Sequence, residues 1–147
     1  VNELIQKCGG ILDGHKFKAY LPGGASGGIL PSTKGDVPLD FGGELTKYGC
    51  FVGSHAIVVL SDKDNLADVA LNLISFFKHE SCGQCTPCRN GTEKIINIIK
   101  NNSKWDKDLL SDISEVMANA SICGLGQAAS NPILSVLKFF PKDVGIK

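Results

Sequence analysis

The chain has 147 residues, of which 43% are hydrophobic and 20% are charged. This composition is that of a folded globular protein, and the length allows one domain or two small ones. Fifteen basic residues balance fifteen acidic ones, which argues against a broad electrostatic interaction with nucleic acid or anionic lipid. The longest apolar run, Ala56–Leu60, is too short to span a membrane. We therefore expect no nucleic-acid partner and no direct membrane insertion.

The first 61 residues are rich in glycine and are predicted to consist mostly of loops. A short helix over residues 2–7 should end at a pair of glycines. Phe17–Leu21 and Ala56–Leu60 have the apolar, β-branched composition of strands. The glycine-rich run Gly23–Gly28 could hold a phosphate, but no helix start follows it, so a structural loop is the favoured interpretation. The chain begins with Val1 rather than methionine, and we expect it to be part of a longer protein.

The remaining residues repeat their apolar side chains with the period of α-helices. Four helices are predicted, around residues 66–77, 95–99, 109–117 and 131–140. Asp62 or Asp64 is expected to cap the first of them, and Pro132 is typical of the first turn of the last. Short connections between four helices predict a small bundle.

Cysteines form the clearest chemical motif in the chain. Cys82, Cys85 and Cys88 lie within seven residues in the pattern C-x2-C-x2-C, and Cys123 follows well downstream. A cubane iron–sulfur cluster takes four thiolates, and the small residues between these cysteines would let the backbone curl around it. Zinc is the main alternative, but structural zinc sites usually combine two cysteine pairs. A triplet with one remote cysteine therefore favours the cluster.

The surroundings of the motif fit a negatively charged group. The triplet lies at the start of the second predicted helix, and Cys123 lies shortly before the last, so backbone N–H groups would face the cluster. Arg89 would add positive charge, with an exposed helix residue as the alternative interpretation. His79 is interpreted either as a hydrogen-bonding residue near the cluster or as a surface histidine at a helix end. Cys8 and Cys50 lie far away in sequence and are interpreted as buried or idle thiols. Because core residues are plentiful, a metal site in a reducing compartment is favoured over a disulfide framework.

Two stretches, 80–91 and 123–129, resemble the flavoprotein (NADH-binding, diaphorase) subunits of NADH dehydrogenases. That family includes the NADH-oxidising subunit of complex I and the diaphorase subunits of NAD-dependent formate dehydrogenases and hydrogenases. The resemblance covers nearly the whole chain. Its closest branch, judged from the motifs at 23–31, 48–55 and 120–124, is the formate dehydrogenase beta subunit.

The resemblance implies an α+β fold in two units. Residues 1–62 would form a partial β-grasp (soluble ligand-binding) module, whose opening hairpin would precede Val1. Residues 63–147 would form a four-helix bundle that binds the cluster. Cys82, Cys85, Cys88 and Cys123 match the four ligands of the family's [4Fe–4S] cluster.

The resemblance also implies a role in electron transfer. The complete subunit exchanges a hydride between NAD(H) and FMN, and then passes single electrons through this cluster to iron–sulfur centres in partner subunits. The flavin- and NADH-binding domain lies upstream of this segment in the family, so no residue of this chain is expected to be catalytic in hydride transfer. The chain would be an electron-relay part of an NAD-dependent oxidoreductase, and a cytoplasmic location is expected, including within a complex on the cytoplasmic side of a membrane.

Other functions remain open from the sequence. Within the family, the parent could be complex I or an NAD-reducing hydrogenase instead of a formate dehydrogenase, or the segment could be a scaffold without electron transfer. Outside the family, a zinc-stabilised interaction module is the alternative.

Overall fold

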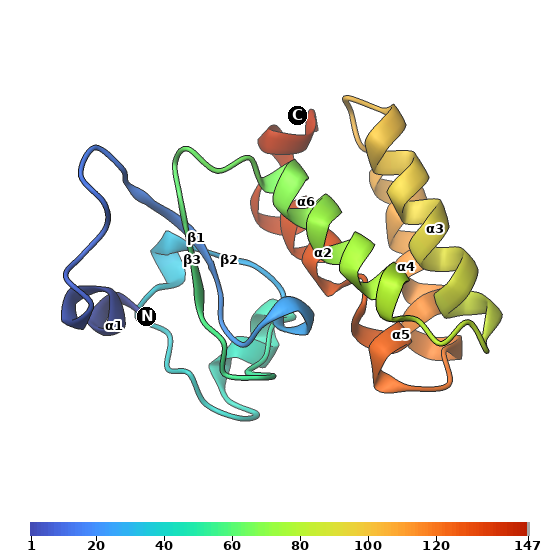
Figure 1. The fold of residues 1–147 in the computed structure, drawn as a ribbon, viewed down its shortest axis with the longest axis horizontal. Helices are drawn as coiled ribbons and strands as arrows, with labels where there is room; N and C mark the ends of the chain where they lie inside the picture. The colour runs from blue at the N-terminus through green and yellow to red at the C-terminus, as the bar shows by residue number, and fades with distance from the viewer. Residues whose placement is uncertain (147) are drawn as a thin grey trace.

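The computed structural model describes residues 1–146 and combines helices with a small antiparallel sheet, which confirms the α+β class. The sheet and α1 lie on one side of the molecule and the long helices on the other (Figure 1). The helices are α1 (Asn2–Lys7), α2 (Leu66–Glu80), α3 (Thr86–Asn101), α4 (Lys107–Ala120), α5 (Gly124–Ala128) and α6 (Asn131–Phe139). The strands are β1 (Phe17–Leu21), β2 (Leu30–Pro31) and β3 (Val58–Ser61), and single 3-10 turns are η1 (Ala25–Gly27), η2 (Ser32–Lys34), η3 (Glu44–Tyr48) and η4 (Pro141–Val144).

The sheet has β1 at its centre, antiparallel to both β2 and β3. Successive side chains of a strand point to opposite faces. Ala19 and Leu21 therefore join the apolar core shared with the helices, whereas Tyr20 packs in a second core under the loops with Leu30 and Leu45. Each face of this small sheet is thus covered by a different part of the chain.

The loop before β3 pairs with the glycine-rich loop instead of with β1. The backbone N–H of Gly24 donates to the carbonyl of Ala56, and that of Ser54 donates to the carbonyl of Gly23. These bonds leave Ala56 outside the sheet, so the second predicted strand begins at Val58 and not at Ala56 as expected. A Cβ on Gly23 would lie 2.2 Å from the backbone nitrogen of Gly53, so this crossing of two backbones requires glycine.

The start of α2 differs from the prediction. The side chain of Asn65 accepts a hydrogen bond from the N–H of Ala67 at 2.9 Å and caps the helix. The prediction of Asp62 or Asp64 as the cap is wrong, because both carboxylates accept backbone N–H groups of the strands: Asp62 from the residue before β1, and Asp64 from Ser61.

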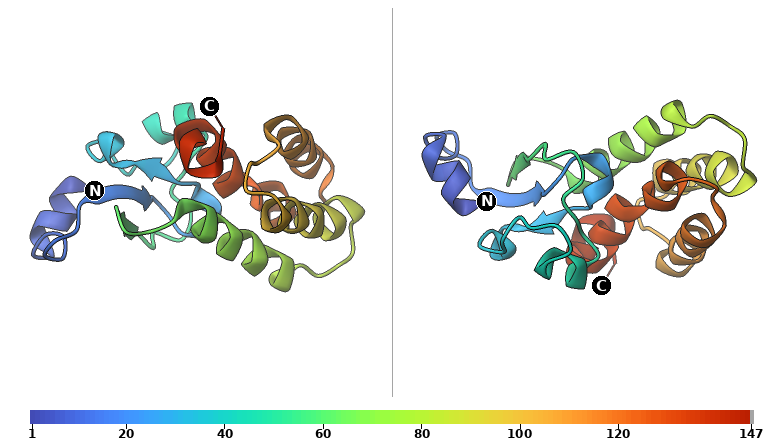
Figure 2. Two further views of the ribbon diagram at one scale, coloured as in Figure 1. Left: turned by 90° about the horizontal axis from the view of Figure 1, so that it is seen from above. Right: turned by 90° about the horizontal axis from the view of Figure 1, so that it is seen from below.

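The four long helices lie where the periodicity predicts them, and each packs on two others. α2 contacts α3 and α6, and α4 also contacts α3 and α6, so that they surround one core (Figure 2). The short helix α5 was not predicted, since five residues with two glycines carry no periodic apolar stripe. It packs against α3 and α4. None of the helices within residues 1–146 is long and apolar enough to cross a bilayer.

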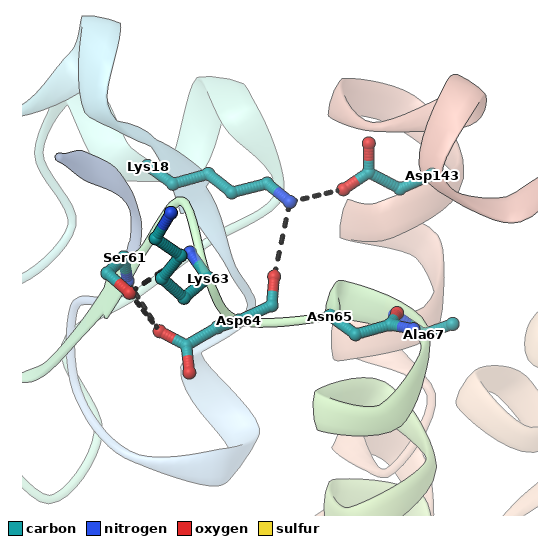
Figure 3. A network of polar contacts seen from close by, with 7 residues as sticks. All are labelled: Lys18, Ser61, Lys63, Asp64, Asn65, Ala67 and Asp143. Carbon is teal, nitrogen blue, oxygen red and sulfur yellow. Dashed lines mark hydrogen bonds and ion pairs between the residues drawn. The ribbon is translucent and has the colours of Figure 1, made fainter. Parts of the chain in front are cut away.

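The C-terminal elements join the sheet to the helices. The Asn131 side chain at the start of α6 donates to the carbonyl of Ser26 in η1, at 2.9 Å. Lys18 of β1 forms an ion pair with Asp143 of η4 at 2.6 Å and also donates to the carbonyl of Asp64 at 3.2 Å (Figure 3). Polar contacts at the start of α6 and in η4 after its end therefore hold the N-terminal part of the chain against the helices.

Candidate metal centre

The four motif cysteines occupy the ends of helices. Cys82 lies in the connection between α2 and α3, Cys85 is the N-cap of α3, and Cys88 lies in its first turn. Cys123 is the N-cap of α5. In Figure 1 the connection between α2 and α3 and the helix α5 lie at the same end of the helical part, and contacts between α3 and α5 place the two segments together.

All four cysteines line one cavity of about 400 Å³. The remaining lining residues are Glu80, Ser81, Gln84, Ile122 and Leu125. Cys88 is buried, Cys85 is half-buried, and Cys82 and Cys123 are exposed. The predicted ligand residues are thus brought to one site by the fold, although Cys123 is far from the triplet in sequence.

The turn that carries the triplet is held by local geometry. Gly83 has a φ of +76°, in the left-handed region that favours glycine. The guanidinium of Arg89, at the start of α3, donates to the carbonyl of Gly83 and to the Thr86 hydroxyl. Arg89 is exposed, yet its side chain folds back and braces the loop between Cys82 and Cys85.

The environment of Cys85 favours its thiolate. The backbone N–H of Ile122 is the main cause that holds the pKa of Cys85 below its usual value, followed by the N–H of Cys88, while slight desolvation opposes them. The Ser121 hydroxyl adds to the lowering of this pKa. Because a thiolate, and not a thiol, binds metal, this environment prepares Cys85 for ligation.

Close packing of α5 against α3 sets the position of Cys123. A Cβ on Gly126 would lie 2.8 Å from the Cβ of Cys88 and 2.7 Å from the Cβ of Ser121. Only glycine allows this approach without displacement of the neighbours. Gly126 therefore determines how near the loop of Cys123 comes to the triplet.

The donor set and its spacing distinguish the possible metal groups. A structural zinc ion needs four ligands about 2.0–2.3 Å from one point. Within residues 1–146 no group of three or more His, Cys, Asp or Glu side chains is arranged to hold a single metal ion. Four thiols around one cavity are the donor set that a cubane iron–sulfur cluster takes.

The other candidate residues lie outside this cavity. The side chain of His79 is 86% exposed and pairs with Glu80 at 3.0 Å, which is the surface interpretation. Cys8 is exposed and lines a different cavity beside α1. Cys50 is buried next to Ser135 of α6, and burial raises the pKa of its thiol.

Sequence reasoning missed the two serines beside the cysteines. Ser81 precedes Cys82 and places its hydroxyl oxygen 3.3 Å from the sulfur of Cys88. Ser121 lies two residues before Cys123 and is buried. Their adjacency to the ligand positions was a signal in the sequence, but the partner of each hydroxyl depends on the fold.

The family model of the NADH-ubiquinone oxidoreductase-F iron-sulfur binding region matches residues 68–146, which is more than half of the chain. The chain belongs to this family. The match spans α3 and α5 and therefore includes all four cysteines of the cavity.

Relatives of the family cover the sheet as well as the helices. In Mycobacterium bovis, the F-type subunit of the NADH-quinone oxidoreductase is 37% identical over 145 residues, which are 95% of this chain and 32% of that protein. The HndC subunit of the NADP-reducing hydrogenase of Solidesulfovibrio fructosivorans is 37% identical over 140 residues, which are 92% of this chain and 28% of that protein. The chain thus spans about a third of the length of the curated relatives that it matches.

A solved structure has the same fold. The crystal structure of an NAD⁺-reducing [NiFe]-hydrogenase in the H2-reduced state superimposes with a TM-score of 0.75 and 28% identity. The superposition covers 88% of this chain and 23% of the hydrogenase chain. The similar proteins are therefore parts of oxidoreductases, named for quinone reduction in some cases and for hydrogenase activity in others.

Proposed function

We propose that this chain is the electron-relay part of an NADH-oxidising flavoprotein subunit, and that Cys82, Cys85, Cys88 and Cys123 hold a [4Fe–4S] cluster. The observation that carries the proposal is the cavity lined by all four cysteines, inside the segment that matches an iron-sulfur binding family. When bound, such a cluster accepts and releases single electrons.

The residues around the cavity have distinct tasks in this proposal. The N–H groups of Ile122 and Cys88 stabilise the thiolate of Cys85, and the positive end of the α3 dipole favours negative charge at the same place. The apolar side chains of Ile122 and Leu125 line the cavity, and the exposure of a cluster to water is one of the factors that set its reduction potential. Arg89 braces the turn between Cys82 and Cys85.

The parent protein supplies the other steps. We infer that FMN and NAD bind outside this segment, that no residue of this chain takes part in hydride transfer, and that the electrons pass to iron–sulfur centres in partner subunits. The motif similarity at 23–31 and 48–55 supports a formate dehydrogenase as the parent, while complex I and an NAD-reducing hydrogenase are the alternatives supported by the names of relatives. Subunits that purify with the full-length protein distinguish the three parents.

The finer fold assignment belongs to the same proposal. Residues 1–62 are interpreted as a partial β-grasp module and residues 63–147 as a four-helix bundle. The antiparallel sheet supports the first interpretation, and the mutual packing of α2, α3, α4 and α6 supports the second.

Anaerobic reconstitution of the full-length protein with iron and sulfide tests the cluster. We expect about four iron and four sulfide per chain, a brown colour, and an EPR signal of a reduced cubane at low temperature. Cys123→Ala should prevent stable assembly, because it removes the only ligand that the start of α5 contributes. Cys8→Ala is the matched control, since this exposed thiol lies outside the cavity, and it should retain the full cluster content.

Two outcomes would contradict the proposal. Stoichiometric zinc in a colourless protein would support the zinc-stabilised module instead. Full cluster content in Cys123→Ala would show that the assignment of this ligand is wrong.

A further inference from the structure

Ser121 carries a buried hydroxyl that the fold leaves without a partner. The residue is 5% exposed, and its oxygen has no hydrogen-bond partner among the described residues. Buried polar atoms are nearly always hydrogen-bonded, and an exception in a native protein calls for an explanation. At Ser121, a group bound in the neighbouring cavity can supply the missing partner.

The hydroxyl of Ser121 lies beside Cys88, one of the cavity cysteines. A Cβ placed on Gly126 would be 2.6 Å from the Ser121 oxygen and 2.8 Å from the Cβ of Cys88, so these atoms border the same small space. Ser121 is not among the residues that line the cavity, so its hydroxyl lies behind the part of the wall that Cys88 forms.

Ser81 approaches the site from the end of α2. Its hydroxyl oxygen is 3.3 Å from the sulfur of Cys88, and either atom can donate while the cysteine carries its proton. Once Cys88 is a thiolate, only the serine has a proton to give. The hydroxyl of Ser121, beside Cys88, can likewise only donate to a ligated sulfur. Ligation therefore turns both serines into obligatory donors and gives the orphaned hydroxyl a partner.

We propose that Ser81 donates a hydrogen bond to the thiolate of Cys88, that the buried hydroxyl of Ser121 beside Cys88 donates to the same group of ligated sulfurs, and that both bonds raise the reduction potential of the cluster that these thiolates hold. The inference rests on the proposed function. Reduction adds one negative charge, which is shared with the ligand sulfurs, so a donor stabilises the reduced state more than the oxidised one. Hydrogen bonds to the sulfurs are among the factors that set cluster potentials.

Redox titration of the full-length protein with Ser121→Ala and Ser81→Ala tests the proposal. Dithionite supplies the electron, mediators set the potential, and EPR measures the reduced fraction. At the midpoint potential of the wild type, each variant should show a ratio of reduced to oxidised cluster about threefold to tenfold lower, where tenfold corresponds to about 59 mV for one electron. Ser130→Ala is the matched control, because Ser130 carries the other buried, unpaired hydroxyl among the described residues and does not line the cavity. It should titrate like the wild type.

The outcomes separate this inference from the proposed function. If the wild type holds no cubane, the proposed function fails first. If the wild type holds it and both alanine variants keep its potential, only the serine inference is overturned. If Ser121→Ala loses its cluster, the Ser81→Ala variant decides the question. Ser81 is only half-buried, so removal of its hydroxyl leaves no buried cavity that could destabilise the fold. A lower reduced ratio in that variant supports the proposal, and an unchanged one overturns it.

Discussion

The loops around the sheet and the helices around the cysteine cavity bring distant segments together by different means. In the loops, backbone meets backbone: a Cβ on Gly23 would lie 2.2 Å from the backbone nitrogen of Gly53. In the helical part, helices meet mostly through apolar side chains, and glycine is needed at single positions such as Gly91 against Met117 and Gly126 against Cys88.

This difference explains which substitutions each region can accommodate. A side chain that is crowded can change its rotamer, whereas a backbone that is crowded must move with its hydrogen bonds. At Gly126 the crowding atoms include the Cβ atoms of Cys88 and Ser121, which no change of rotamer can move, so this contact behaves like the backbone contact at Gly23. Most of the helical packing around the site can therefore accommodate a larger side chain by changes of rotamer, whereas the contact at Gly126 cannot.

The largest effect is expected from Gly23→Ala. The added methyl group would overlap the backbone of Val52 and Gly53, and the loops can separate only by breaking the bonds between Gly23 and Ser54. We expect a loss of about 3 kcal/mol or more in the free energy of unfolding, measured by urea denaturation. A loss below about 1 kcal/mol would show that the loops separate easily and that the backbone contact at Gly23 does not make them rigid.

An intermediate effect is expected from Gly126→Ala. The methyl group would collide with Cys88 and Ser121, which costs about 1–3 kcal/mol in the free energy of unfolding and moves Cys123 away from the triplet. Cluster content after reconstitution should fall as well. The matched control is Gly124→Ala in the same helix, where a Cβ meets nothing within 4 Å.

The Gly124→Ala control should not lower the free energy of unfolding. Alanine at Gly124 reduces the freedom of the unfolded chain and should leave stability unchanged or raise it by about 0.4–1 kcal/mol. Equal cluster content in both glycine variants would refute the role of Gly126 in placing Cys123.

The smallest expected effect is a pH dependence of the free energy of unfolding, which arises from Asp64 just before α2. Asp64 accepts hydrogen bonds from the N–H and hydroxyl of Ser61 at 2.6 and 3.0 Å, and these bonds hold the pKa of its carboxyl below the usual value. The folded pKa is lower than the unfolded one, so the contribution to stability is present above about pH 3.9 and is lost as the pH falls through the folded pKa. Figure 3 shows this contact beside the Lys18–Asp143 ion pair.

Asp64→Asn should therefore flatten the decline of stability in acid. Urea unfolding midpoints at pH 5 and at successively lower pH values measure it, with the exposed loop residue Asp13 changed to Asn as the control. The same acid decline in Asp64→Asn and in the wild type would show that these bonds contribute nothing to stability.

The sequence by itself determined the helices and the set of cysteines. The apolar period over α2, α3, α4 and α6 is a local property, and it predicted all four helices. β1 was predicted to the residue, because its composition and its flanking turns are equally local. The C-x2-C-x2-C spacing identified three cavity residues without any knowledge of the fold.

Only the tertiary structure decided the rest, because each remaining feature depends on a partner far away in the chain. β3 begins at Val58 since Ala56 bonds to the glycine-rich loop. α5 has no periodic signal and owes its place to packing on α3 and α4. Cys123 reaches the triplet through Gly126, and the hydroxyl of Ser121 comes to lie beside Cys88 by the same contact. The spacing of residues in a sequence shows which side chains could form a site, whereas the packing of two helices determines which of these side chains come into contact.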